Sequence, residues 1–292
     1  MDPQLPRRDL LKKVALGAAA LASSKAFPKH HEESAPMSFK RNIHHSACKW
    51  CYKGYDLDTF CRRGKEVGLE AVDLVNADEI PTLKQHGLEA SLVWGVPGGI
   101  VKGLNRLENH DAIVDFFAAT APKVAAHGAK RMIVFSGNRN GLDDEQGLEN
   151  CRIGLERIMP IVEKAKVQVV MELLNSKRNH ADYQCDHTAW GVELVKAVGS
   201  EHFKLLYDIY HMQIMDGDVI DTIRENHPYF GHYHTGGVPG RNEIDETQEL
   251  YYPAIMQAIV DTGFDGYVAQ EFVPTWEDPI AALAHGIRTC DV

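Results

Sequence analysis

The sequence lacks the glycine-rich motifs that mark nucleotide-binding folds. Neither GxGxxG nor GxxxxGK[ST] follows the first strand-like segment, 42–47, and this counts against an open, doubly wound sheet. An apolar run near the N-terminus, 14–22, is shorter than the ~20 residues that a bilayer-spanning helix needs. We therefore expect no stable membrane anchor.

Positive charge is scarce relative to negative charge. The chain has 31 Lys and Arg against 41 Asp and Glu, a formal net charge of −10. The first 36 residues are weakly basic, so the remainder is more acidic still. Because an acidic surface repels phosphate backbones, the composition predicts no nucleic-acid partner. It also counts against an endonuclease-IV-like nuclease, which would need a basic face and more His and Asp ligands for several zinc ions.

Residues 1–38 are predicted to be a targeting segment and linker. A pair of arginines, Arg7 and Arg8, precedes two leucines, a lysine and a weakly hydrophobic, Ala-rich run. This order resembles the twin-arginine signal, which exports folded proteins. We expect a periplasmic protein, with a cytoplasmic location as the alternative. Residues 39–292 are then expected to form one domain, and whether it assembles into a homo-oligomer stays open.

Cysteine is used sparingly, with six residues scattered along the chain. An even number in an exported protein favours disulfides, but a twin-arginine cargo folds first in the reducing cytoplasm. Cys48 and Cys51 have the CxxC spacing of redox motifs, and no second CxxC accompanies them for a zinc site. We expect ordinary loop cysteines here.

Strand-like and helix-like segments alternate after residue 40. Amphipathic stretches at 110–127 and 146–166 have helical periodicity. Eight such alternations, with long loops after several strands, predict an α/β fold, a (β/α)8 TIM barrel with its binding face at the carboxyl ends of the strands. The expected strands are 42–47, 69–75, 88–94, 129–136, 167–174, 203–209, 229–234 and 266–272.

Four residues that can bind a cation stand at the ends of the last four strand-like runs. They are Glu172, Asp208, His234 and Glu271, separated by 36, 26 and 37 residues, close to the ~30 residues of one strand–helix unit. Equivalent strand ends meet on one rim of a barrel, where three carboxylates would repel one another unless a cation lay among them. Oxygen ligands with one imidazole suit one divalent ion such as Mn²⁺, Mg²⁺ or Co²⁺. Salt bridges and a packed core histidine are the alternatives.

The segments around these residues carry a family resemblance. MELLNSK, YDIYHM, GHYHTGG, VPGR and QEF together resemble the xylose-isomerase-like TIM-barrel superfamily over roughly residues 40–280, and within it hydroxypyruvate isomerases. The resemblance implies that the four residues above hold one divalent cation. It also implies that His211 and Arg241 contact substrate oxygens, although the spacing from His234 to Arg241 is one residue longer than in related ketose epimerases.

Further residues are candidates for the pocket. Trp50 and Trp94 follow the first and third strands and are predicted to wall it, with a plain core role as the alternative. Asn175 and Lys177 follow Glu172 closely, so each is either near the site or on a surface loop.

The resemblance implies an intramolecular oxidoreductase acting on a small hydroxy-carbonyl compound. Hydroxypyruvate and tartronate semialdehyde would interconvert by proton transfer through an enediolate, with Glu172 and Glu271 as the candidate acid–base residues. A ketose 3-epimerase and an inosose-type dehydratase of the same superfamily remain open, as does a non-catalytic exported sugar-binding barrel.

Overall fold

Eight short parallel strands form the inner sheet of the molecule. The computed structural model describes residues 39–292, so the predicted export signal lies outside the described residues. All eight predicted strands are present, most of them shorter than the apolar run that predicted them. They are β1 (His44–Cys48), β2 (Ala71–Asp73), β3 (Glu89–Ala90), β4 (Arg131–Val134), β5 (Gln168–Glu172), β6 (Phe203–Asp208), β7 (Phe230–Thr235) and β8 (Tyr267–Gln270).

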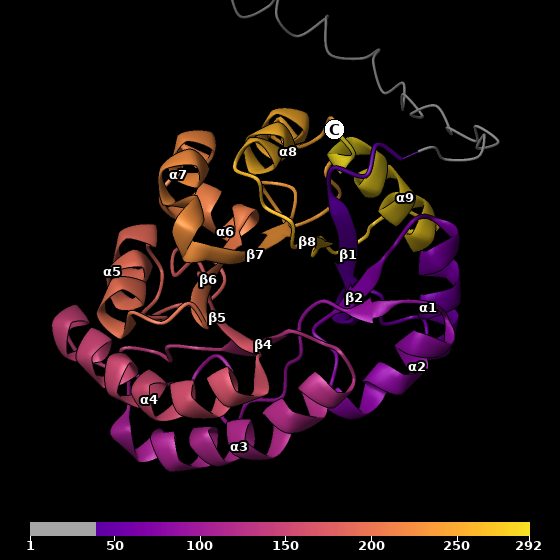
Figure 1. Cartoon of the computed structure of the whole chain (residues 1–292). Coiled ribbons are helices and arrows are strands. Elements are labelled where there is room, and N and C mark those ends of the chain that lie inside the picture. The colour runs from indigo at the N-terminus through magenta and orange to yellow at the C-terminus, as the bar shows by residue number, and fades with distance from the viewer. Residues whose placement is uncertain (1–38) are drawn as a thin grey trace, which may run out of the picture. The chain divides into compact units, whose positions relative to one another are not determined.

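The sheet curls round so that its first and last strands pair. Its order is β3-β2-β1-β8-β7-β6-β5-β4, and β1 lies parallel to β8. Between β3 and β4 the contact is a single bridge from Val93 to Met132, with hydrogen bonds of 3.0 Å from Val93 N to Arg131 O and from Ile133 N to Val93 O. Figure 1 shows the strands as an inner ring surrounded by helices. The predicted (β/α)8 barrel is confirmed.

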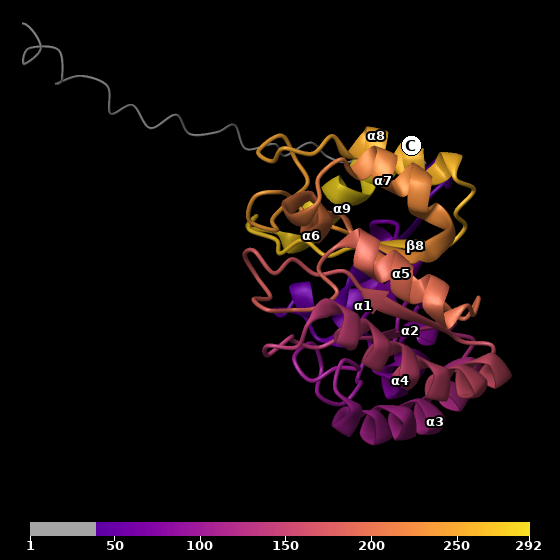
Figure 2. The ribbon, with the colours of Figure 1, turned by 90° about the vertical axis from the view of Figure 1, so that its left-hand side faces the viewer.

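The helices cover the outside of the strands. The two amphipathic stretches predicted as helices, 110–127 and 146–166, form α3 and α4, which lie side by side (Figure 2). The α-helices are α1 (Leu57–Glu66), α2 (Ile80–Gln85), α3 (His110–Ala126), α4 (Asp144–Ala165), α5 (Thr188–Val198), α6 (Ile209–Met215), α7 (Val219–Asn226), α8 (Tyr252–Asp261) and α9 (Pro279–Cys290). Short 3₁₀ turns are η1 (Lys49–Cys51), η2 (Ala77–Glu79), η3 (Leu107–Asn109) and η4 (His227–Tyr229).

Burial explains why the strands read as continuous apolar runs. A parallel strand has a packed barrel interior on one face and helices on the other. Accordingly β7 is buried at every position, and β5 and β6 at all but one each. A charged or imidazole side chain at the end of such a strand is therefore buried as well, and it needs a partner. This places the polar residues at the strand ends under a strong physical constraint.

The cysteines depart from the expectation of loop residues. Cys48 ends β1 and Cys51 lies in the 3₁₀ turn η1. All six cysteines are buried and unpaired, so no disulfide joins the described part of the chain. Burial raises the pKa of the Cys48 and Cys51 thiols well above the usual value. Since the thiolate is the reactive form, this pair has no redox-motif character.

Within residues 39–292, no helix is both long and apolar enough to cross a membrane.

Candidate active site

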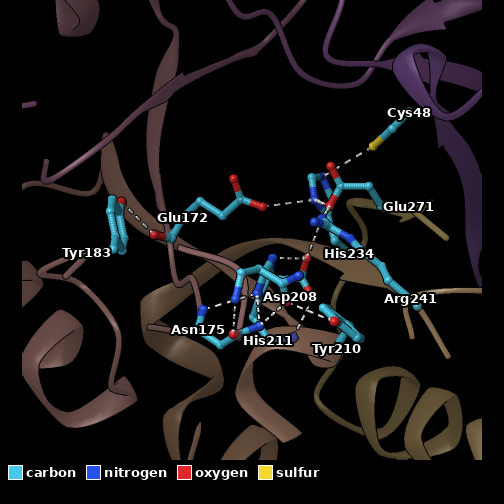
Figure 3. Close-up of polar contacts among 12 residues, drawn as sticks. Cys48, Glu172, Asn175, Tyr183, Asp208, Tyr210, His211, His234, Arg241 and Glu271 are labelled. Carbon is cyan, nitrogen blue, oxygen red and sulfur yellow. Dashed lines mark hydrogen bonds and ion pairs between the residues drawn. The ribbon is translucent and has the colours of Figure 1, made fainter. Parts of the chain in front are cut away.

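The four predicted ligands meet at the carboxyl ends of β5 to β8. Glu172, Asp208, His234 and Glu271 are all buried, and they offer one ligand atom each within 4.8 Å of one another. His234 Nδ1 lies 2.8 Å from Glu271 Oε2 and 3.4 Å from Glu172 Oε1. Figure 3 shows the side chains of Glu172, His234 and Glu271 pointing toward one another. The strand–helix repeat has brought together residues that are up to 99 positions apart in the sequence.

The electrostatics of this cluster are those of crowded, buried carboxylates. Burial raises the pKa of Glu172, and the neighbouring Glu271 carboxylate raises it further. Burial also raises the pKa of Asp208 to about 8. Although burial opposes ionisation of Glu271, Arg241 and His234 hold its pKa well below the usual range. The nearby positive charge therefore favours the ionised form of Glu271, while the pKa values of Glu172 and Asp208 are both raised.

Arg241 reaches the cluster from the loop after β7. Its Nη2 pairs with Glu271 Oε2 and lies 3.4 Å from Asp208 Oδ2. The guanidinium is held 5.4 Å from the ring centres of both Trp50 and Tyr210, while its Nε has no hydrogen-bond partner. The guanidinium therefore keeps an unused donor beside the acidic cluster.

The loop that carries Arg241 needs a close backbone approach. Gly237 N donates to Asn242 O, which folds the segment back on itself. A Cβ at Gly237 would stand 2.4 Å from the carbonyl oxygen of Glu243, so a side chain at this position would push the segment out. The extra residue between His234 and Arg241 thus lies within a folded-back loop, and Arg241 still reaches Asp208 and Glu271.

His211 is placed by the same aspartate that belongs to the cluster. Asp208 caps α6, and its Oδ1 accepts a hydrogen bond of 2.9 Å from His211 N. His211 Nδ1 accepts from Asn175 N at 3.0 Å, so the proton of the neutral ring is on Nε2. That Nε2 is buried without a hydrogen-bond partner, 3.6 Å from Asp208 Oδ2. His211 thus holds an unused donor next to Asp208.

The cluster opens onto a pocket of about 420 Å³. Trp50 and Trp94 both line it, 37% and 44% exposed, on the rim rather than in the core. Trp50 Nε1 donates a hydrogen bond of 2.8 Å to Glu271 Oε1. The other lining residues are Lys49, Leu74, Asn76, Glu79, Ile100, Phe135, Glu172, Leu174, His180, Arg241 and Glu271.

Asn175 and Lys177, the two candidates that follow Glu172 in the sequence, lie in different surroundings. Asn175 is buried and its side chain contacts His211 Nδ1 at 2.6 Å, so it supports the site without lining the pocket. Lys177 is exposed, and its Nζ donates to Ile214 O at 2.9 Å, away from the cluster.

Sequence reasoning missed Asp73 and His180. Asp73 ends β2 and lies 3.1 Å from His234 Nε2, a position that the strand-end rule used for Glu172 would also have found. His180 lines the pocket from the loop after β5, with its ring 5.2 Å from that of His211. No sequence signal marks His180, because its place depends on the path of a long loop.

The residues present fit a divalent cation. Glu172 Oε1 is buried with no hydrogen-bond partner, and buried carboxylate oxygens are normally satisfied. Arg241 makes ion pairs with Asp208 and Glu271, and Glu172 has no such pair with it. Three carboxylates and one imidazole nitrogen are the donor set that ions such as Mn²⁺, Mg²⁺ and Co²⁺ accept.

Comparison with known proteins shows the family of the chain and agrees with its fold. The family model described as xylose isomerase-like TIM barrel matches residues 80–290. The chain belongs to this family. Solved structures with a similar fold are also found. A protein titled AP endonuclease, family 2, from Brucella melitensis has a TM-score of 0.74 and 25% identity, covering 83% of this chain and 97% of that one. D-psicose 3-epimerase from Clostridium cellulolyticum H10 shares the fold, with a TM-score of 0.68 and 18% identity over 86% and 100% of the two chains.

Curated relatives are matched over segments of different length. A Homo sapiens protein provisionally named hydroxypyruvate isomerase is 34% identical over 36% of this chain, and 2-oxo-tetronate isomerase from Cupriavidus necator is 33% identical over 37%. These alignments span only 38% and 41% of the relatives' own lengths. A Danio rerio protein, also provisionally named hydroxypyruvate isomerase, is 28% identical over 82% of this chain and 91% of its own.

Proposed function

We propose that the protein is a metal-dependent isomerase of small hydroxy-carbonyl compounds that interconverts hydroxypyruvate and tartronate semialdehyde. The observation that carries the proposal is the buried set of Glu172, Asp208, His234 and Glu271, which opens onto a pocket beside Arg241. The names of the relatives, two hydroxypyruvate isomerases and a 2-oxo-tetronate isomerase, support the prediction of an isomerase.

Glu172, Asp208, His234 and Glu271 would hold one divalent cation. When bound, the ion supplies Lewis-acid polarisation of adjacent carbonyl and hydroxyl oxygens, which acidifies the C–H bond between them. Its identity among Mn²⁺, Mg²⁺ and Co²⁺ is a matter for the assay below, because the donor set suits all three.

The residues of the chain carry the proton transfer. A glutamate removes a proton from the hydroxyl-bearing carbon to give an enediolate, and a proton is returned to the neighbouring carbon while the hydroxyl proton moves between the two oxygens. Glu172 and Glu271 are the two candidates, since both line the pocket. The net change is the exchange of a ketone and a primary alcohol for an aldehyde and a secondary alcohol.

Arg241 and His211 supply donors for substrate oxygens. The unpartnered Nε of Arg241 can donate to a substrate carboxylate, for which the planar guanidinium fork is suited. The protonated Nε2 of His211 can donate to an oxygen that becomes negatively charged in the enediolate. Trp50 and Trp94 line the pocket and would shield the bound substrate from water.

The test is a turnover assay on metal-free protein with Mn²⁺, Mg²⁺ or Co²⁺ added back separately. We expect tartronate semialdehyde to form from hydroxypyruvate only in the presence of one of these ions. Absence of this conversion with every metal, in protein shown by elemental analysis to have bound one, would rule out the proposed reaction. Metal binding without turnover of any substrate would favour the exported sugar-binding barrel.

A ketose 3-epimerase is the second candidate, and the size of the pocket favours it. On the scale of a water molecule's ~30 Å³ share of liquid, a three-carbon keto acid occupies on the order of 100 Å³. The pocket measures about 420 Å³ and has apolar walls that include Trp94, Phe135 and Leu174. Five- and six-carbon ketoses, and inososes for the dehydratase alternative, therefore belong in the same assay, and the ratios of kcat/KM decide among the activities.

We also propose that the protein acts after export through the twin-arginine route. The paired Arg7 and Arg8 support this proposal. Residues 1–38 fused to a folded reporter should deliver it to the periplasm, and replacing both arginines with lysine should keep it in the cytoplasm.

A further inference from the structure

A buried aspartate from β2 lies behind His234, on the side away from the carboxylate cluster. Asp73 Oδ1 is 3.1 Å from His234 Nε2, and its Oδ2 is 2.8 Å from His232 Nε2. Ser91 Oγ donates to Oδ2 at 2.5 Å, and the Cys48 thiol lies 3.6 Å from Oδ1. The carboxylate is therefore surrounded by donors, although it is fully buried.

These donors favour the ionised form of Asp73. Each oxygen of its carboxylate lies within hydrogen-bonding distance of one imidazole nitrogen, and Oδ2 also accepts a hydrogen bond from Ser91 Oγ. An ionised carboxylate has only acceptor atoms. The ring nitrogens that face Asp73, Nε2 of His232 and Nε2 of His234, must therefore both carry a proton.

The proton on Nε2 decides what the other nitrogen of His234 can do. A neutral imidazole has one N–H and one lone pair, so a proton on Nε2 leaves the lone pair on Nδ1. Nδ1 is the atom that faces Glu271 Oε2 and Glu172 Oε1, at 2.8 and 3.4 Å. A ring with the opposite tautomer would present an N–H to the ion position and could not act as a ligand there.

Contacts with His232 and Ser91 fix the orientation of the Asp73 carboxylate. His232 and His234 are two residues apart on β7, so both point to the same side of the strand. Their Nε2 atoms contact the two oxygens of the Asp73 carboxylate. Ser91 is in turn linked to Ser46 of β1 by a hydrogen bond of 2.7 Å between their Oγ atoms. Contacts from three other parts of the barrel thus fix the orientation of Asp73.

We propose that Asp73 is a positioning residue of the metal centre, which holds His234 in the tautomer and ring orientation that present Nδ1 to the ion. The inference rests on the proposed function, because it assumes that His234 is a ligand. A hydrogen-bonded carboxylate behind a ligand imidazole raises its basicity and fixes its orientation, and loss of such a partner lowers metal affinity roughly 10–100-fold.

The test compares Mn²⁺ binding by titration calorimetry in metal-free samples of the parent protein and of Asp73→Asn. The amide of asparagine has nearly the same shape as the carboxylate, but it has a single acceptor oxygen for two imidazoles. We expect a Kd roughly 10–100-fold weaker for Asp73→Asn. Asp186→Asn is the matched control, because Asp186 is another buried aspartate that pairs with Arg139 and is not among the clustered ligand residues. Its Mn²⁺ affinity should equal that of the parent.

The outcomes separate this inference from the proposed function. A parent protein that binds no Mn²⁺, Mg²⁺ or Co²⁺ overturns both. A parent that binds Mn²⁺ while Asp73→Asn binds it equally well, or while Asp186→Asn weakens it to the same extent, overturns the role of Asp73 alone.

A second measurement covers the case in which Asp73→Asn does not fold. The parent protein, labelled with ¹⁵N in its histidine rings and loaded with diamagnetic Mg²⁺, should give a His234 spectrum with the proton on Nε2. A proton on Nδ1 would overturn the proposal without any variant.

Discussion

Trp50, which follows the first strand of the barrel, donates a hydrogen bond of 2.8 Å from its Nε1 to Oε1 of Glu271, which follows the last strand. The contact spans 221 positions of sequence and depends on the pairing of β1 with β8. The same indole packs against the guanidinium of Arg241, which binds the other carboxylate oxygen of Glu271. Trp50 therefore constrains the orientation of a candidate acid–base residue as well as lining the pocket.

Replacing Trp50 with Phe should reduce turnover more than substrate binding. The ring remains as a wall, while the hydrogen bond to a charged group, worth about 1.5–3 kcal/mol, is lost. We expect kcat to fall roughly 10-fold with little change in KM. Trp94→Phe is the matched control. Trp94 lines the same pocket, but within residues 39–292 its side chain donates no hydrogen bond to the cluster. Equal kcat values for the two variants would contradict this role of Trp50.

Glu271→Gln should remove most of the activity. The amide is isosteric but cannot accept or return a proton, and positioned acid–base groups contribute roughly 10²–10⁴-fold to rate. We expect a loss of kcat in that range, measured with hydroxypyruvate at saturating metal. Glu172→Gln should behave in the same way. Glu193→Gln, an exposed position on α5, provides the control and should retain parent activity. Unchanged turnover in Glu271→Gln would count decisively against the proposed mechanism.

Removing bound metal should lower the thermal stability of the protein as well as abolish its activity. A ligand present at 100 times its Kd stabilises the folded state by about 2.7 kcal/mol. For a domain of this size that corresponds to a rise in Tm of roughly 5–10 °C. Differential scanning fluorimetry with a chelator, and then with Mn²⁺, Mg²⁺ or Co²⁺ restored, measures the shift. A Tm that is the same in all samples would mean that the buried carboxylate cluster binds none of these ions.

Arg241→Lys should discriminate between charged and neutral substrates. Lysine retains the positive charge beside Asp208 and Glu271, but it lacks the planar fork that binds a carboxylate through two hydrogen bonds. We expect kcat/KM for hydroxypyruvate to fall roughly 10–100-fold, corresponding to about 1.5–3 kcal/mol, and the value for a neutral ketose to change less. Arg178→Lys, on the exposed loop after β5, is the control. The same loss with both substrates would show that Arg241 does not read the carboxylate.

Much of this barrel can be predicted from the sequence, because the patterns that indicate it involve residues close together along the chain. A strand buried on both faces is mostly apolar, so β5, β6 and β7 stand out, and the charged or imidazole side chains near their carboxyl ends are conspicuous. The regular spacing of strand–helix units then predicts that Glu172, Asp208, His234 and Glu271 share one rim. The extents of the strands were less predictable: only Glu89 and Ala90 pair in β3, because pairing depends on how the neighbouring strands are placed.

The sequence by itself thus determined the alternation of elements, the closed parallel sheet and the rim on which the acidic residues meet. Only the tertiary structure decided that Asp73 from β2 lies behind His234, that Trp50 is bonded to Glu271, and that His180 lines the pocket. The physical reason is the range of the interactions. Burial patterns and helix caps depend on residues a few positions apart, whereas these contacts depend on barrel closure and loop paths that bring distant segments within hydrogen-bonding distance.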